Sequence, residues 1–182
     1  MPLPPPACAR EASHQRSITI TAYARSDGLW DIEGHLTDAW TKPVPRAGGL
    51  LPPGEPMHSM RLRLTVDGTA TIVAAQAVTE AGPYDQACGA IAPDYGQLVG
   101  VRVARGYRDA IRRLFGRTAG CTHMNELAGV MGSAALQAMW EVLTQDPDER
   151  PFSIDGCHAL KSSGAQVAQF FPRWYRAEPE GG

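Results

Sequence analysis

The feature that most constrains the fold is the Asp67-Gly68 pair, which separates two runs of alternating polar and apolar residues. The first run covers residues 57–66 and the second covers residues 71–78. Asp-Gly between two such runs is typical of a β-hairpin with a tight turn. On the first run the residues predicted to face the core are Met60, Leu62, Leu64 and Val66.

A second hairpin is predicted near the N-terminus. Residues 17–23 alternate and are rich in β-branched side chains, and a Ser26-Asp27-Gly28 turn precedes another alternating run at 29–36. Side chains alternate between the two faces of a strand, so Ile32 and its even-numbered neighbours should face the core and His35 should lie on the polar face. An antiparallel sheet of three to five strands is therefore expected before residue 80.

Helical patterns follow the strands. Residues 91–98 indicate a short helix, residues 107–115 carry apolar side chains at helical spacing, and residues 123–143 are predicted to form the longest helix. Strands first and helices last predict an α+β fold of two layers, in which an antiparallel β-sheet of hairpins packs against C-terminal helices.

The predicted domain organisation is simple. Prolines in residues 1–16 favour an extended N-terminal arm, and residues 17–176 are expected to form a single α+β domain. Within that domain, the proline- and glycine-rich stretch 38–56 is predicted to be a long loop. Loops of this length in compact domains usually cover a site.

Composition excludes several classes of function. The chain has 182 residues, 43% of them apolar, with 17 basic and 19 acidic side chains, so we expect no nucleic-acid surface. No apolar run is long enough to span a membrane, which leads us to expect a cytoplasmic protein. The four cysteines show no disulfide-framework spacing, and no glycine-rich phosphate loop or dinucleotide fingerprint predicts a nucleotide cofactor.

The stretch 120–127 concentrates reactive side chains. Cys121 and His123 lie near the expected start of the longest helix, with Thr122 as the predicted N-cap and Glu126 one turn further on. The N-terminus of a helix favours a thiolate or a bound anion. This stretch is therefore the predicted centre of the functional site.

We expect three imidazoles from distant parts of the chain to meet at this centre beneath the proline-rich loop. The candidate catalytic residues are His35, His58, His123, Glu126 and Asp38. A histidine paired with a carboxylate can take up and return a proton near neutral pH. Zinc or iron is an open alternative, with His58, Cys121 and His123 as candidate ligands. The candidate substrate-binding residues are Trp40, Arg61, Tyr84, Tyr95 and Tyr107.

Several motifs carry a resemblance to a known family. They are residues 27–38 (DGLWDIEGHLTD), 54–60 (GEPMHSM), 64–67 (LTVD), 119–123 (AGCTH) and 172–175 (PRWY). With these motifs the chain resembles an uncharacterised bacterial family, domain of unknown function 2889. The order of hairpins, a cysteine-containing loop and a cysteine before a long helix also resembles the NifU and IscU type of iron–sulfur scaffold. That second resemblance implies a three-point site at His58, Cys88 and Cys121, although His58 replaces a cysteine.

Three functions remain open from the sequence. The first is a small cytoplasmic enzyme that performs histidine-centred acid–base chemistry of the lyase or isomerase type, with or without a metal. Its expected substrate is a hydroxylated small molecule, aromatic or not, and a homo-oligomer is a further option. The second is a non-enzymatic carrier of metal, sulfur or an iron–sulfur cluster. The third is a module that binds a small ligand without chemistry.

Overall fold

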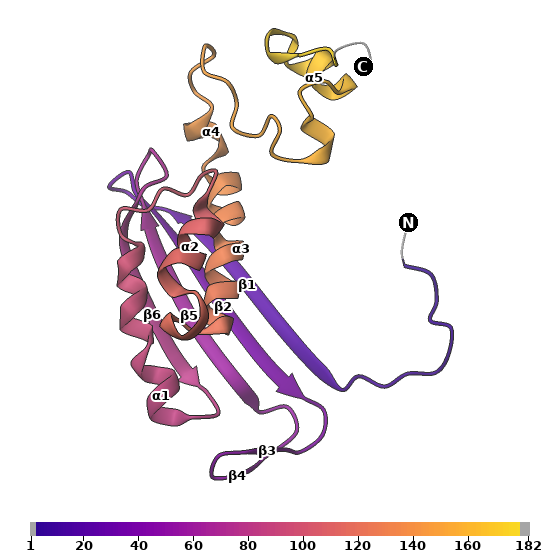
Figure 1. The fold of residues 1–182 in the computed structure, drawn as a ribbon, viewed down its shortest axis with the longest axis vertical. Helices are drawn as coiled ribbons and strands as arrows, with labels where there is room; N and C mark the ends of the chain where they lie inside the picture. The colour runs from indigo at the N-terminus through magenta and orange to yellow at the C-terminus, as the bar shows by residue number, and fades with distance from the viewer. Residues whose placement is uncertain (1–2, 179–182) are drawn as a thin grey trace. The chain divides into compact units, whose positions relative to one another are not determined.

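The computed structural model describes residues 3–178, and the chain divides into two compact units, Met1–Met139 and Trp140–Gly182. The first unit contains a four-stranded antiparallel sheet and the helices that pack on it (Figure 1). The fold is therefore α+β, as the sequence predicts. Whether residues 17–176 form a single domain stays a prediction. No helix in the described part of the chain has the length and apolar character needed to cross a membrane.

The main sheet is built from the two predicted hairpins. Its strands are β1 (His14–Ala24), β2 (Trp30–Trp40), β5 (Pro56–Val66) and β6 (Ile72–Ala81), in the spatial order β1-β2-β5-β6. Burial on β2 alternates through Ile32, Gly34, Leu36 and Asp38, whereas the odd-numbered residues between them are partly exposed. The strand therefore turns one face to the core and the other away from it.

The stretch 38–56 is not the continuous loop that the sequence predicts. β2 continues to Trp40, and a small hairpin of β3 (Val44–Arg46) and β4 (Gly49–Leu51) forms a separate two-stranded sheet. Prolines are tolerated here because β3 and β4 pair only with each other and each strand keeps a free edge. β1 is also longer than expected and begins at His14, within the segment predicted to be an arm.

The helices of the first unit follow β6. They are α1 (Asp85–Ala90), the 3-10 helix η1 (Ala92–Leu98), α2 (Tyr107–Phe115), the 3-10 helix η2 (Arg117–Ala119) and α3 (Thr122–Ala138). The predicted helix 123–143 is interrupted, because α3 ends at Ala138 and α4 (Trp140–Leu143) is a separate helix in the second unit. Met139 has φ −92° and ψ 10°, which departs from α-helical geometry.

α3 packs across the inner face of the sheet. Met124, Leu127 and Met131 are fully buried on this helix. Gly34 permits the close approach, since a Cβ at this position would lie 2.7 Å from Sδ of Met131 and 2.8 Å from Cδ1 of Leu127. This contact fixes α3 against the middle of β2 and directs its first turn toward the end of that strand.

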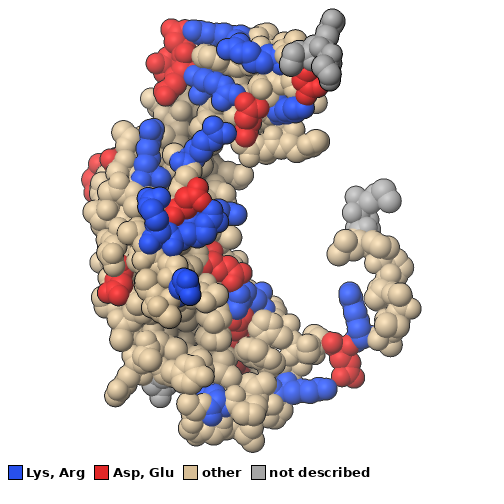
Figure 2. Space-filling view, in the orientation of Figure 1, with Lys and Arg blue, Asp and Glu red and all other residues tan. Residues whose placement is uncertain are grey.

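α2 lies beside α3 and is amphipathic, with an apolar side toward the core and a charged side toward solvent. Its buried side is formed by Tyr107, Ala110, Ile111 and Phe115. Figure 2 shows basic side chains gathered over α2 with an acidic one among them, and the helix carries Arg112, Arg113 and Asp109. This surface faces water, as expected of an amphipathic helix.

The Tyr107 hydroxyl is buried and has no hydrogen-bond partner within the described part of the chain. A buried hydroxyl without a partner costs about 1–3 kcal/mol. Tyr107→Phe is therefore expected to stabilise the protein by about 1 kcal/mol, measured as a rise in the urea midpoint. Tyr95→Phe is the matched control and should destabilise it, because the Tyr95 hydroxyl contacts Oδ1 of Asn125 at 2.6 Å.

The second unit contains short elements only. After α4 these are the 3-10 helix η3 (His158–Leu160), α5 (Ala165–Phe170) and the 3-10 helix η4 (Pro172–Trp174). Its buried apolar side chains are Ile154 and Val167. The Asp155 carboxylate connects two of its loop segments, because it accepts a hydrogen bond from the backbone N–H of Ser162 at 2.7 Å.

Candidate functional site

Asp38 is the centre of a polar cluster on the helix-covered face of the sheet. It occupies the inward position that continues Ile32, Gly34 and Leu36, and its side chain is 1% exposed. The strand register places Arg16 of β1 and His58 of β5 directly beside it, one on each neighbouring strand. A row of three polar residues therefore crosses the sheet at the end of β2.

Five contacts converge on the Asp38 carboxylate from two neighbouring strands, β1 and β5, and from helix α3. Arg16 donates from Nε to Oδ1 at 2.8 Å and from Nη2 to Oδ2 at 2.7 Å. Nε2 of His14 lies 3.1 Å from Oδ1, and Nδ1 of His58 lies 3.1 Å from Oδ2. Nε2 of His123, in the first turn of α3, lies 3.5 Å from Oδ2. The carboxylate is thus surrounded by groups that are cationic or can become so.

This arrangement keeps Asp38 ionised. Burial by itself raises the pKa of a carboxyl group, but the hydrogen bonds and the positive charge of Arg16 act in the opposite direction, followed by His123 and His58. The net result is a pKa of Asp38 below its ordinary value. Bidentate pairing with an arginine is among the strongest ways to stabilise a buried carboxylate.

His58 and His123 form a stacked pair above the carboxylate. Their ring centroids lie 3.7 Å apart with an interplanar angle of 28°. Burial lowers the pKa of both imidazoles, only partly opposed by the charge of Asp38, and His58 and Arg16 further lower the pKa of His123. Both rings are therefore neutral at pH 7, and two protons on the pair would repel each other.

The tautomer of His58 follows from its contact. A carboxylate only accepts hydrogen bonds, so Nδ1 of His58 carries the proton that it donates to Asp38. Nε2 of the neutral ring then keeps its lone pair. The side chain is 14% exposed, and that of His123 is 22% exposed, so solvent reaches a part of each side chain.

The lowered pKa values of His58 and His123 predict how stability depends on pH. The unfolded chain takes up protons at these residues near pH 6.5, whereas the folded protein resists protonation until lower pH. Acidification below about pH 6.5 should therefore destabilise the fold. The thermal unfolding midpoint should therefore fall between pH 8 and pH 5. In the variant His58→Gln the midpoint should depend less strongly on pH. An unchanged slope would contradict the prediction.

Arg16 connects the cluster to α3. Its Nη1 forms an ion pair with Oε2 of Glu126, while its other nitrogens hold Asp38. Glu126 is thus tied to the cluster through Arg16. Trp40 also reaches this region, because its ring lies 4.3 Å from that of His14. Arg16 thus pairs with two carboxylates, Asp38 and Glu126, which balance its charge. These two ion pairs let Arg16 position the cluster.

Three of these side chains could hold a metal. One ligand atom each from Asp38, His58 and His123 can be chosen so that all lie within 4.8 Å of one another. Two imidazoles and one carboxylate are a donor set suited to zinc or ferrous iron. Among the described residues, no other group has this ligand spacing. It contains Asp38, whereas the sequence analysis named Cys121 as the third candidate ligand. The Cys121 sulfur lies 3.9 Å from Nδ1 of His123.

The start of α3 is held by partly buried hydrogen bonds. The Tyr95 hydroxyl accepts from the backbone N–H of Cys121 at 3.0 Å, and Nδ2 of Asn125 donates to the carbonyl of Phe115 at 2.8 Å. Cys121, and not Thr122, occupies the N-cap position, and its side chain makes no capping hydrogen bond. The predicted N-cap was wrong, because Tyr95 and Asn125 stabilise this end of the helix.

His35 does not join the cluster. It lies on the opposite face of β2, where its Nε2 is 3.0 Å from Oγ of Ser59, and Ser59 donates to Glu80 at 2.8 Å. Arg61 is on the same side and donates to Glu80 at 2.7 Å. The expected meeting of three imidazoles is therefore corrected, since His14 and not His35 accompanies His58 and His123.

The three predicted tyrosines also lie apart from the carboxylate. Tyr84 is 65% exposed. Tyr95 and Tyr107 are buried, and burial raises the pKa of both phenols. Tyr95 acts through the backbone of Cys121, as described above. Of the predicted substrate-binding residues, Trp40 is the one with a contact to the cluster.

Sequence reasoning missed His14 and Arg16. Both have even numbers and share the face of Ile18 on β1, so extending the predicted run by three residues, from 17 back to 14, would have placed them opposite the end of β2. The signal was weak because residues 14–16 lack apolar side chains. Pairing with β2, and not local propensity, makes this part of the strand.

None of the four cysteines is among the cluster ligands within the described residues. Cys88 lies on α1, where its Sγ would be 2.9 Å from a Cβ placed at Gly82, and all four thiols are free. Within the described residues, the group with metal-ligand spacing contains no cysteine. The carrier hypothesis, which relies on Cys88 and Cys121, stays a prediction.

Comparison with known proteins identifies one family. A family profile described as "Protein of unknown function (DUF2889)" matches residues 14–137. No curated protein matches the chain. No solved structure matches it either, so the resemblance to the NifU and IscU type of scaffold is not confirmed. The matched range begins and ends within the first unit and includes every residue of the Asp38 cluster.

Proposed function

The chain belongs to the DUF2889 family, and from the Asp38 cluster we propose that it is an enzyme that transfers protons through His58. The observation that carries the proposal is the 3.1 Å contact between Nδ1 of His58 and the buried, ionised Asp38. A carboxylate in this position orients an imidazole and stabilises the imidazolium that forms when the ring takes a proton.

The proposed chemistry uses the free Nε2 of His58 as a general base. It removes a proton from a hydroxyl group or from a carbon next to a carbonyl, and the positive charge that forms on the ring is balanced by Asp38. The imidazolium of His58 then returns this proton to a neighbouring atom of the substrate, while the neutral ring of His123 remains stacked on it. Removal and return at different atoms is isomerase chemistry, and loss of a leaving group between them is lyase chemistry.

A divalent metal is the second candidate, favoured by the ligand spacing of Asp38, His58 and His123. A bound zinc or iron ion would supply a Lewis acid that polarises a substrate carbonyl or hydroxyl. Arg16 already donates to both oxygens of Asp38, so a metal would have to share Oδ2 with it. This competition is why we place the metal-free function first.

The proposal is tested by proton exchange with solvent. The protein is incubated in D2O with a panel of hydroxylated carboxylic acids and phenolic compounds, and loss of C–H signals is followed by NMR. His58→Gln is expected to slow the exchange by about a hundred- to ten-thousandfold, the usual range for a general base. His158→Gln is the matched control, because that imidazole is exposed in the second unit.

Two outcomes decide between the candidates. Equal exchange by the wild-type protein and His58→Gln would contradict the proposed role of His58. Elemental analysis of the purified protein tests the metal: one equivalent of zinc or iron that is lost in both His58→Gln and His123→Gln supports the metal-assisted function. Visible absorbance from bound iron and sulfide would favour the carrier. The substrate class and the cytoplasmic location stay predictions.

A further inference from the structure

The outer edge of β1 is an unprotected strand edge. β1 has β2 on one side, and within the described residues no strand pairs with its other side (Figure 1). The strand is 11 residues long, runs in register with β2 throughout and contains neither proline nor lysine. Natural proteins usually protect such an edge with a bulge, a proline, a lysine or a covering segment.

The opposite edge of the sheet is paired where β6 begins, which makes the contrast with β1 informative. The segment after η1 pairs with the start of β6, where the N–H of Ile72 donates to the carbonyl of Val101 at 3.0 Å. Gly100 donates back to Ile72 at 2.8 Å. The free edge of β1 is therefore not a general property of this sheet.

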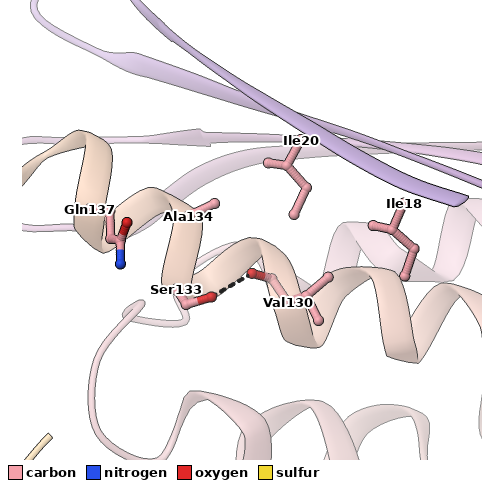
Figure 3. A pocket seen from close by; sticks show the side chains of 6 residues that line it. All are labelled: Ile18, Ile20, Val130, Ser133, Ala134 and Gln137. Atoms are coloured by element: carbon pink, nitrogen blue, oxygen red, sulfur yellow. Dashed lines mark hydrogen bonds between the residues drawn. The ribbon is translucent and has the colours of Figure 1, made fainter. Parts of the chain in front are cut away.

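An open apolar groove of about 410 Å³ follows the free edge on the helix-covered face. Figure 3 shows Ile18 and Ile20 of β1 pointing toward Val130 and Ala134 of α3. All residues that line the groove belong to the first unit. A small molecule would fill the groove but leave the backbone groups of the edge unpaired, whereas a strand would satisfy both.

The sequence of β1 suits a second copy of itself. Antiparallel pairing over the full length, His14–Ala24, places Thr19 on the two-fold axis and Ile18 opposite Ile20 of the second copy. Residues of the same face then meet, because paired positions differ by an even number. Arg16, the one permanent charge on the strand, lies opposite Ala22 of the second copy, so no like charges oppose each other.

We infer that the chain forms a symmetric homodimer through β1, in which two four-stranded sheets become one continuous sheet. The two grooves join into one apolar seam along the axis, formed by Ile18 and Ile20 of both copies. Because Arg16 holds Asp38, each polar cluster borders this interface. The inference does not depend on the chemistry proposed for His58.

Disulfide trapping tests the interface and its register. Opposite residues in an antiparallel pair have Cα atoms about 4.5–5.5 Å apart, within the range of a disulfide. Thr19→Cys should therefore give a covalent dimer on oxidation with diamide. Thr21→Cys is the matched control on the same face, because its two copies would be about 14 Å apart along the strands. Both are made in the full chain with the exposed Cys8 and Cys157 changed to serine.

Sedimentation velocity supplies the second measurement. The molar mass obtained for the unmodified chain should be twice the 19.6 kDa of one copy. Ile20→Lys should shift it to the monomer, whereas Val78→Lys, an exposed position on β6, should leave the dimer intact. Trapping of Thr19→Cys at least tenfold faster than Thr21→Cys supports the inference. The inference would be overturned if the unmodified chain were a monomer at all concentrations, or if the two cysteine variants were trapped equally fast. Both outcomes can be measured even if Ile20→Lys fails to fold.

Discussion

Asp38→Asn is expected to lower the free energy of unfolding by about 2–3 kcal/mol at pH 7.5. Removing one partner of a buried ion pair costs about 3–5 kcal/mol, because the other partner remains without its counter-charge. Arg16 is about one-third exposed and keeps its ion pair with Glu126, so part of that cost is avoided. Urea denaturation of both proteins measures the difference.

The loss should also depend on pH in a defined direction. The pKa of Asp38 is lowered in the folded protein, so its stabilising effect is complete above the unfolded value near 3.9 and disappears as pH falls through the folded value. The wild type and Asp38→Asn should therefore approach each other in stability at strongly acid pH. Glu80→Gln is the control: Glu80 is 43% exposed on the other face, and its loss should cost less than about 1 kcal/mol. Equal losses in the two variants would contradict the central position of Asp38.

The fold could be predicted to the extent that local patterns determine it. Alternation and the Asp67-Gly68 turn predicted the β5–β6 hairpin, and strands followed by helices predicted the α+β class. Alternation also placed His35 on the polar face of β2. Positions 35 and 38 differ by an odd number, so this observation already separated His35 from Asp38. The hypothesis of three meeting imidazoles disregarded that constraint.

The remaining parts of the site depend on pairing between distant segments. His14 and Arg16 belong to the sheet because β2 supplies their partners, and no local preference of residues 14–16 predicts a strand. The end of β2 was assigned to a loop for a similar reason. The prolines that follow Trp40 favour a loop, and the pairing of β2 with β5 is not visible in the local sequence. The cross-strand row of Arg16, Asp38 and His58 is visible only once the register is known.

Gly120→Ala is expected to destabilise the protein by about 1–3 kcal/mol, the usual cost of forcing a group into a filled space. A Cβ at this position would lie 2.5 Å from Cβ and 2.6 Å from the carbonyl oxygen of Phe115. Backbone atoms are part of this obstacle, so the chain before α3 would have to move. Gly120 has an extended conformation, with φ −155° and ψ 178°, which means that space and not backbone strain requires glycine here.

Gly129→Ala is the matched control and should have the opposite sign. Gly129 lies within α3 and has no atom within 4 Å of an added Cβ, so alanine should stabilise the helix by about 0.5–1 kcal/mol. The displacement in Gly120→Ala should also reach His123, three residues further along α3, and weaken its stacking on His58. Imidazole NMR shifts of the two histidines should therefore change in Gly120→Ala and stay constant in Gly129→Ala. If both variants kept the wild-type shifts, the start of α3 would not be what positions His123 above the carboxylate.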